Sequence, residues 1–375
     1  MFLDYSVTDE SSLFSIFAEG SDPQFDKIVE SLGYIARRKP KPVIDSVMFW
    51  RKSKSEVAAN AAHEVEKVLI QARKTLPEDA QLALAAPAPP PPAPAPPKPK
   101  RSLSLMRNKS KSHRRNQSSV STLSSDPEWM KKKQVVDSQV DVVKQTAINA
   151  EKKSLVSIYI LCRVLMEVVK QTPTEVMGED LGDKLEEIVY TQLKTTDPAS
   201  TSQSIIRAAN WTLFAQLLGL MSEKRFLSVS DRFVFDLEKL PQRINHEDEA
   251  RLYLLISAMK YLKMNHYPPE LFEDSKEFMQ ILAKFFERTT NEAVLYAYCD
   301  SISNLVLPLA NNLTAEANDP GWNEGIEKIY NKAIDMWRKL PEASTSTSIS
   351  SILHPQTSHF GSGWSHLMNV ITATL

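Results

Sequence analysis

The stretch KKSLVSIYILCRVLMEVVKQTP, residues 152–173, decides the fold of this 375-residue chain. Nearly every position from 155 to 169 is apolar, and a helical wheel places these side chains on more than one face: Leu155, Ile158, Tyr159, Cys162, Leu165, Met166 and Val169. A helix that is apolar on several sides is packed on several sides. The run is shorter than the about 20 apolar residues of a membrane span, and Arg163 and Glu167 lie in its middle. It therefore predicts a buried helix.

Composition favours an all-α protein in a reducing compartment. Only 9 of the 375 residues are glycine, against about 7% in an average chain, and few segments alternate apolar and polar residues as strands do. Cys162 and Cys299 lie in apolar helical runs, which indicates buried, reduced thiols rather than a disulfide or metal site. The N-terminus has no basic region before its apolar residues, so we expect no signal peptide. These features predict a cytoplasmic protein.

Helical periodicity recurs along most of the chain. Near the N-terminus it covers residues 25–36 and 43–50, and a narrower stripe follows, either as a third helix or as a continuation of the second: Val57, Ala61, Val65, Val68 and Ala72. Beyond residue 173, broadly apolar helices alternate with helices that have one apolar face. The broadly apolar ones are expected over residues 205–221, 252–264 and 294–313.

The spacing of the broadly apolar helices predicts the architecture. Their centres lie near Leu161, Trp211, Ile256 and Ile302, which gives a period of roughly 45 to 50 residues, as in HEAT or armadillo repeats. We therefore expect an all-α, HEAT/armadillo-like α-solenoid of paired antiparallel helices, interrupted by a disordered linker.

The linker is marked by an abrupt change in composition. Residues 87–99 are proline and alanine with one lysine, which cannot form a hydrogen-bonded helix and favours polyproline II or disorder. Basic residues and serines follow, with no acid between Asp79 and Asp126. Such a segment cannot bury a core, so we expect residues 77–125 to be exposed and positively charged.

These patterns divide the chain into successive parts. The expected parts are an N-terminal helical segment (1–76), the Pro-rich and basic linker (77–125), helical repeats (126–341), a Ser/Thr-rich loop (342–360) and the start of a further helix (361–375). The last helix has no partner in the sequence, whereas solenoids close with a helix whose outer face is polar. We therefore expect a piece of a longer array.

No motif of enzymatic chemistry occurs in the sequence. It contains no P-loop, GxSxG, HExxH or CxxC pattern, and no glycine-rich turn follows a strand. Asp300, inside an apolar run, is either a buried polar contact or a solvent-facing residue of a groove. We expect a protein that is not an enzyme and has no cofactor or metal site.

A proline motif in the linker is typical of partner recognition. Pro96, Pro99 and Arg101 match PxxPxR, the spacing with which a polyproline II helix sets two prolines into the aromatic grooves of an SH3 domain. The alternative is a stiff spacer without a partner.

A phosphorylation pattern follows the proline motif. His113 and Arg115 precede Ser118 in the order His-x-Arg-x-x-Ser, which kinases of the NDR/LATS class prefer because their acidic pockets pair with the upstream basic groups. Weaker candidates, each three residues after an arginine, are Ser104 and Ser110. A phosphate at Ser118 would add about −1.5 to −2 charge to a basic segment. The alternative is a solvated basic tail.

Three long segments together resemble one known family. Residues 22–56 (DPQFDKIVESLGYIARRKPKPVIDSVMFWRKSKSE), 151–173 (EKKSLVSIYILCRVLMEVVKQTP) and 256–287 (ISAMKYLKMNHYPPELFEDSKEFMQILAKFFE) are similar to the N-terminal region of the Furry family of cell-morphogenesis scaffolds, in a fungal form. The likeness spans most of residues 11–340 apart from the linker. It implies a long HEAT/armadillo array that binds an NDR-class kinase and its Mob coactivator and supports polarised growth. The departures are the linker and the length, since family members are several times longer.

We therefore expect a non-enzymatic scaffold for a kinase–Mob complex at the cell cortex and at sites of polarised growth, with the linker as a phosphorylatable arm. A different hypothesis is a module that binds anionic lipid or RNA through the basic residues 98–115, by salt-dependent attraction. No aromatic residue interleaves this cluster, so base stacking and specific nucleic-acid recognition are not expected. A third hypothesis, a transport receptor, rests on architecture alone.

Overall fold

The computed structural model describes residues 20, 22–75, 127–239, 246–264, 269–308 and 319–343. Its elements are α2 (Pro23–Ala36), α3 (Pro40–Thr75), α5 (Pro127–Gln171), α6 (Thr174–Met177), α7 (Glu179–Lys194), α8 (Pro198–Gln203), α9 (Ile205–Ser222), α10 (Phe226–Glu238), α11 (His246–Ala258), the 3₁₀ turn η1 (Met259–Tyr261), α12 (Pro269–Arg288), α13 (Glu292–Val306) and α14 (Pro320–Ala343). No strand occurs among the described residues, which confirms the all-α prediction there. None of these helices is both long and apolar enough to cross a membrane.

The chain divides into two compact units. The repeat unit comprises residues 1–56 and 152–375, and the hairpin unit comprises residues 57–151. Helices α3 and α5 each contribute residues to both units, because α3 ends and α5 begins within the hairpin unit.

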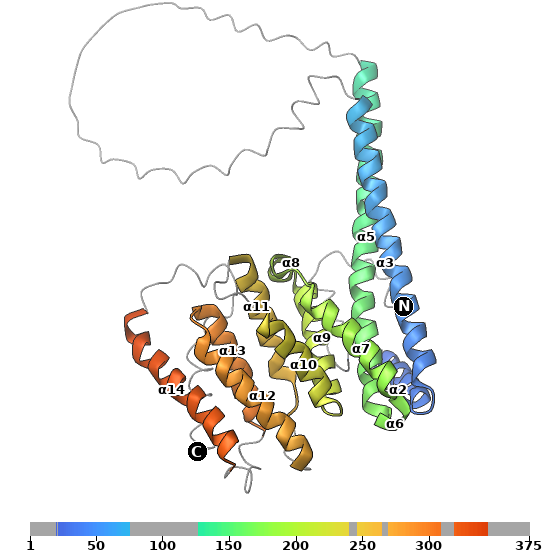
Figure 1. Ribbon diagram of the computed structural model, residues 1–375. Helices are drawn as coiled ribbons and strands as arrows, with labels where there is room; N and C mark the ends of the chain where they lie inside the picture. The colour runs from blue at the N-terminus through green and yellow to red at the C-terminus, as the bar shows by residue number, and fades with distance from the viewer. Residues whose placement is uncertain are drawn as a thin grey trace, which may run out of the picture. The chain divides into compact units, whose positions relative to one another are not determined.

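Helices of the repeat unit stack in two layers (Figure 1). In one layer α7, α10, α12 and α14 contact one another in that order. In the other layer α9 contacts α11 and η1, which contact α13. The C-terminal part of α5 lies against α9, where Asn210 Nδ2 donates to the carbonyl of Leu155 (3.0 Å). Such stacking of helices in two layers is the arrangement of an α-solenoid.

Hydrogen bonds between equivalent helices follow the predicted repeat length. Ser301 Oγ donates to the carbonyl of Ile256 (2.6 Å), 45 positions earlier, and joins α13 to α11. Gln280 Nε2 donates to the carbonyl of Gly321 (3.0 Å), 41 positions later, and joins α12 to α14. These separations are close to the predicted period of roughly 45 to 50 residues, so the α-solenoid prediction is confirmed.

Residues 152–173 form the C-terminal part of α5 and the loop after it. Tyr159, Cys162 and Leu165 are buried there, which confirms the predicted buried helix. Both cysteines are free and buried, as predicted. Burial raises the pKa of the Cys162 thiol and raises that of Cys299 to about 12, so both thiols stay protonated at neutral pH.

The N-terminal helix α2 packs on this part of α5. Asp22 caps α2 by accepting hydrogen bonds from two backbone amides of its first turn. One turn later Asp26 pairs with Arg163 of α5 (3.0 Å), and at the far end the Thr172 hydroxyl donates to the carbonyl of Ala36 (3.3 Å). The charge inside the apolar run of α5 therefore serves the contact between α2 and α5.

Two details differ from the expectations. The stripe after residue 50 continues the second helix as part of α3, which is one of the two expected alternatives, but Val57 is exposed and Ala58 is half-buried in its place. The expected helix 294–313 ends at Val306, because Pro308 has no amide hydrogen with which to continue it.

In the hairpin unit α3 and α5 lie side by side (Figure 1) and run antiparallel, since the chain leaves the end of one and returns at the start of the other. Their inward positions recur at alternating spacings of three and four: Ala58, Ala61, Val65, Val68 and Ala72 on α3, and Val136, Val140, Val143, Ala147 and Ala150 on α5. This heptad pattern is that of a two-stranded coiled coil. Val140 and Ala150 are buried, and the named α3 residues are half-buried.

Candidate functional site

The site residues predicted in the linker lie outside the described residues. They are Pro96, Pro99, Arg101, Ser104, Ser110, His113, Arg115 and Ser118, and they stay predictions. Asp300 is described: its carboxylate is partly exposed and pairs with Lys260 Nζ at 3.1 Å. Asp300 is therefore partly exposed and ion-paired, and no groove is described around it.

A small cavity lies where α5 ends. Its volume is about 20 Å³, and Gly182 and Met221 are among its walls; it has room for about one water molecule. Burial lowers the pKa of Lys224 in the same wall, as in catalytic lysines. However, the ammonium group donates to the carbonyls of Val169 (2.8 Å) and Thr172 (2.7 Å) at the end of α5, which is a helix-capping role.

The cavity beside Lys224 does not have the size that a ligand needs. The cavity beside Lys224 is far smaller than the pockets of about 300 Å³ or more that hold substrates and cofactors. Within the described ranges, no group of three His, Cys, Asp or Glu side chains is placed to hold a metal ion. The remaining candidates are surfaces and the polar contacts that stabilise them.

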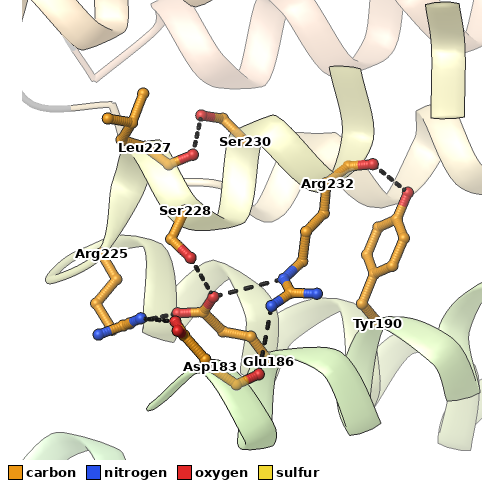
Figure 2. A network of polar contacts seen from close by, with 8 residues as sticks. All are labelled: Asp183, Glu186, Tyr190, Arg225, Leu227, Ser228, Ser230 and Arg232. Carbon is orange, nitrogen blue, oxygen red and sulfur yellow. Dashed lines mark hydrogen bonds and ion pairs between the residues drawn. The ribbon is translucent and has the colours of Figure 1, made fainter. Parts of the chain in front are cut away.

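A buried polar network, the α7–α10 polar seam, joins these two helices (Figure 2). At its centre the Glu186 side chain is 0% exposed. One carboxylate oxygen accepts from Arg225 Nε. The other accepts from the Ser228 hydroxyl (2.6 Å) and lies 3.5 Å from Arg232 Nε. A buried carboxylate is tolerated when it is paired and hydrogen-bonded, and these three side chains supply that pairing.

Gly182 makes room for the Arg225 guanidinium in the seam. A β-carbon at Gly182 would lie 2.8 Å from Arg225 Cζ, which is closer than side chains pack. Arg225 also pairs with Asp183, and the Asp183 carbonyl accepts from Arg232 Nη2 (3.3 Å). The missing side chain at Gly182 therefore lets one guanidinium reach two carboxylates of α7.

Tyr190 extends the seam along α7. Its hydroxyl lies 2.8 Å from Asp236 Oδ2 and 2.9 Å from the carbonyl of Arg232, and its ring meets Phe233 edge-on. Burial and the Asp236 carboxylate raise the pKa of Tyr190, so the phenol keeps its proton and donates it. Lys194 pairs with the other oxygen of Asp236 (2.7 Å).

The α7–α10 polar seam suits a structural role, because its central carboxylate is inaccessible and its charges are matched within the fold. No helix was expected over the residues of α7, so this network was not predicted from the sequence. A signal was present, since apolar residues recur at every fourth position: Leu181, Leu185, Val189 and Leu193. The burial of Glu186 has no signature in a single sequence.

The outer side of α10, the α10 face, is the strongest candidate for binding a partner. Leu227, Asp231 and Phe235 recur on it at every fourth residue, and the side chains of Leu227 and Phe235 are 48% and 57% exposed. Residues four apart share one side of a helix. Exposed apolar side chains gathered on one side mark interaction sites, and aromatic residues are enriched at protein interfaces.

Carboxylates border the α10 face. Burial and the nearby carboxylates of Glu277 and Asp274 on α12 raise the pKa of Asp231. Within the described ranges, none of these three acids forms an ion pair with a lysine or arginine. The Phe235 ring is already contacted by Lys239 Nζ, 3.4 Å from its centroid. The part of the α10 face around Asp231 and the acids of α12 therefore suits a partner segment that is basic and carries apolar side chains.

Comparisons with known proteins agree with one another. A family model described as "Cell morphogenesis N-terminal" matches residues 151–375. The chain is 46% identical over 339 residues to the cell morphogenesis protein PAG1 of Saccharomyces cerevisiae, covering 86% of this chain and 14% of that protein. It is 38% identical over 191 residues to the cell polarity protein mor2 of Schizosaccharomyces pombe, covering 50% of this chain and 9% of that protein. The chain thus spans a small part of these relatives, and no solved structure matches it.

Proposed function

The chain belongs to the Furry family of cell-morphogenesis proteins, and from this premise we propose that it is a non-enzymatic scaffold that supports polarised growth. Its partner in this proposal is an NDR-class kinase together with the Mob coactivator. Its place of action is the cell cortex at sites of polarised growth.

The observation that carries the scaffold proposal is the α10 face. Leu227 and Phe235 present apolar surface on a helix of the repeat layer, and beside them burial and the carboxylates of Glu277 and Asp274 raise the pKa of Asp231. A helical array that is stabilised by buried contacts between its helices and carries such a face suits the docking of another protein. In this proposal a basic, apolar segment of the kinase–Mob complex binds the α10 face.

The linker has a second role in the proposal, as a substrate arm. Its support is the match of His113, Arg115 and Ser118 to the pattern that NDR-class kinases prefer. Docking on the repeat unit would raise the effective concentration of Ser118 near the kinase, with Ser104 and Ser110 as weaker acceptors. The same arm carries the proposed SH3 ligand of Pro96, Pro99 and Arg101.

Docking is tested with a purified kinase–Mob complex in a pull-down by this chain. The double variant Leu227→Ala/Phe235→Ala is expected to bind at least about tenfold more weakly, as loss of buried apolar anchors at an interface predicts. Ile205→Ala is the matched control, because Ile205 is 51% exposed but lies on α9. Binding that is unchanged in the double variant, or equally weakened in the control, would overturn the assignment of the α10 face.

The substrate arm is tested separately by phosphosite mapping after incubation with the kinase. Phosphate is expected at Ser118 in the unaltered chain and is expected to fall strongly in His113→Ala/Arg115→Ala. A chain without residues 77–125 is expected to retain binding of the kinase–Mob complex. If that deletion abolishes binding, the linker and not the repeat unit is the docking site.

The alternative function, binding of anionic lipid or RNA by the linker, rests on its basic residues. From Lys98 to Arg115 the sequence carries eight lysines and arginines and no acid. Sedimentation with vesicles that contain phosphatidylserine, by the intact chain and by a chain without residues 77–125, would distinguish it. Binding that disappears with residues 77–125, in a chain that does not bind kinase–Mob, would favour this alternative over the scaffold.

A further inference from the structure

One side of α5 in the hairpin unit is unusual for a coiled coil, because it carries no charge. On the opposite side of the heptad seam, the positions next to the seam are charged, as coiled coils commonly have them: Asp137, Lys144 and Glu151. The uncharged side, which we call the α5 flank, consists of exposed residues between positions 134 and 150: Val135, Ser138, Gln139, Val142, Thr146 and Asn149.

Two valines of the α5 flank are far more exposed than valines that pack within a helical unit. Val135 is 57% exposed and Val142 is 66% exposed. They are seven residues apart, which places them two turns apart on the same side of the helix. The α5 flank therefore has an apolar stripe of its own, separate from the seam that holds α3 and α5 together.

The hydroxyl groups of the α5 flank are already bonded within the helix. The Thr146 hydroxyl donates to the carbonyl of Val142 (2.9 Å), and the Ser138 hydroxyl donates to the carbonyl of Gln134 (2.8 Å). Burying a polar group costs little when its hydrogen bond persists. The α5 flank can therefore be covered by another apolar surface without leaving these donors unsatisfied.

The hairpin unit also leaves its own seam incompletely buried. The seam residues of α3 are alanines and valines that stay half-buried, because two helices can cover only part of a small side chain between them. Isolated helices are marginal in water, and most of their stability comes from tertiary packing. A four-helix bundle buries such seams on more sides.

We propose that the α5 flank pairs with the α5 flank of a second copy of this chain, so that two hairpin units form a four-helix bundle. A charge-free flank meets itself without like-charge repulsion, whereas a partner selected by its charge would find nothing complementary on it. A two-fold axis near Ser138 and Gln139 sets Val135 of each copy beside Val142 of the other. This reciprocity is that of an isologous interface, which closes at two copies.

The dimensions fit a stable dimer. The part of α5 in the hairpin unit is about 37 Å long at about 1.5 Å per residue, and two helices are about 20 Å wide. Pairing of whole hairpin units along this length, with α3 covered as well as the α5 flank, would cover roughly 700 Å² on each copy, close to the about 800 Å² of a standard interface. The pairing goes beyond the scaffold proposal and does not depend on it, and two paired scaffolds would present two docking faces together.

The first test is sedimentation velocity of the full chain over a range of concentrations. The unaltered chain is expected to sediment as a dimer, and Val135→Glu/Val142→Glu as a monomer with unchanged helical circular dichroism. Ile148→Glu is the matched control: Ile148 is 45% exposed on the same helix but lies outside the α5 flank, so this variant is expected to remain a dimer. An unaltered chain that is monomeric at every concentration, or a control that dissociates equally, overturns the proposal.

The second test determines the register of the two α5 helices, and its variants are not expected to disturb the fold. In Val135→Cys/Val142→Cys a mild oxidant is expected to give a disulfide-linked dimer on a non-reducing gel. Either single variant is expected to give far less, because identical residues lie about two turns apart across the axis. The native Cys162 and Cys299 are buried and do not interfere. Equal cross-linking by the single and the double variants contradicts the proposed register.

Discussion

Glu186 is the residue on which the packing of α7 against α10 most depends. Its carboxylate is inaccessible and holds Arg225, Arg232 and Ser228. Removal of one partner leaves buried charges uncompensated, at a typical cost of about 3–5 kcal/mol. Glu186→Ala is therefore expected to lower the free energy of unfolding by about 3 kcal/mol, measured by urea denaturation with circular dichroism.

The control for this prediction is Asp183→Ala. Asp183 pairs with the same Arg225, but its side chain is 56% exposed, and exposed ion pairs contribute less than about 1 kcal/mol. Equal losses in the two variants would mean that burial of Glu186 is not what stabilises the seam.

The charge of Asp231 destabilises the fold, whereas the charge of Glu186 stabilises the packing of α7 against α10. Burial and the carboxylates of Glu277 and Asp274 raise its pKa in the folded chain. An acid with a raised folded-state pKa destabilises the fold while it is ionised, and this cost disappears as the pH falls through the folded pKa and below about 4, the unfolded value. Asp231→Asn is expected to raise the free energy of unfolding by about 0.3 kcal/mol at neutral pH, and the gain is expected to vanish near pH 3.

Urea denaturation of Asp231→Asn at both pH values checks the prediction. A gain of the same size at both would show that repulsion among these carboxylates is not its cause. A carboxylate kept at the expense of stability is typical of binding surfaces, so the same variant is also expected to weaken docking on the α10 face.

At the scale of single residues, burial can be predicted where apolar neighbours in the sequence indicate it, but not where the partners come from another helix. Cys162 and Cys299 were predicted to be buried thiols because apolar residues surround them in the sequence. Nothing in the sequence distinguishes Glu186 from an exposed glutamate, because its partners come from another helix about 40 residues away.

At the scale of elements, α5 contains two patterns that the sequence already separates. Residues 155–169 are apolar on several sides and are packed on several sides, as predicted. Residues 136–150 pack on α3 through one narrow stripe, since the width of the packed apolar stripe reflects the number of neighbours within the fold. The apolar stripe of α3 was predicted to begin at Val57, whereas Ala58 is the residue that packs. Valine is more hydrophobic than alanine, so the sequence pattern favours Val57 although its side chain is exposed.

The contact of α9 with η1 depends on Gly219. A β-carbon at this position would overlap the carbonyl oxygen of Tyr261, which is backbone and cannot move aside as a flexible side chain can. Gly219→Ala is therefore expected to lower the free energy of unfolding by about 2 kcal/mol, measured by urea denaturation.

A second glycine provides the control for this substitution. In α14 a β-carbon at Gly325 would have its nearest neighbour, Gln280 Cα, at 3.7 Å. Gly325→Ala is expected to raise the free energy of unfolding by about 0.5–1 kcal/mol, because alanine favours the helix. Changes of the same sign in both variants would contradict the argument from close approach.

At the scale of the whole molecule, charge is unevenly distributed along the sequence. The formal net charge is −1, yet residues 98–115 carry eight basic residues and no acid, so the remainder of the chain is net acidic. Attraction between such surfaces and their partners is screened at high salt. Binding through the linker and binding through the acidic α10 face therefore both weaken with salt, and only variants can separate them.

The relatives extend far beyond this chain, which covers 14% of PAG1 and 9% of mor2. The repeat period was predictable from the sequence because broadly apolar helices recur at regular distances. The partner-binding face was not, because it depends on which apolar residues remain exposed after the layers pack. Leu227 and Phe235 lie in the same apolar stretch as the buried Phe226 and Phe233, and the sequence does not distinguish them.

The most direct test of the scaffold proposal is hydrogen–deuterium exchange of this chain, alone and with an excess of NDR-class kinase and Mob. The proposal predicts slower exchange on the repeat unit, centred on α10 and the adjoining turns of α12, whether or not residues 77–125 are present. Slower exchange confined to the linker, or no change anywhere in a chain that stays folded, would contradict it.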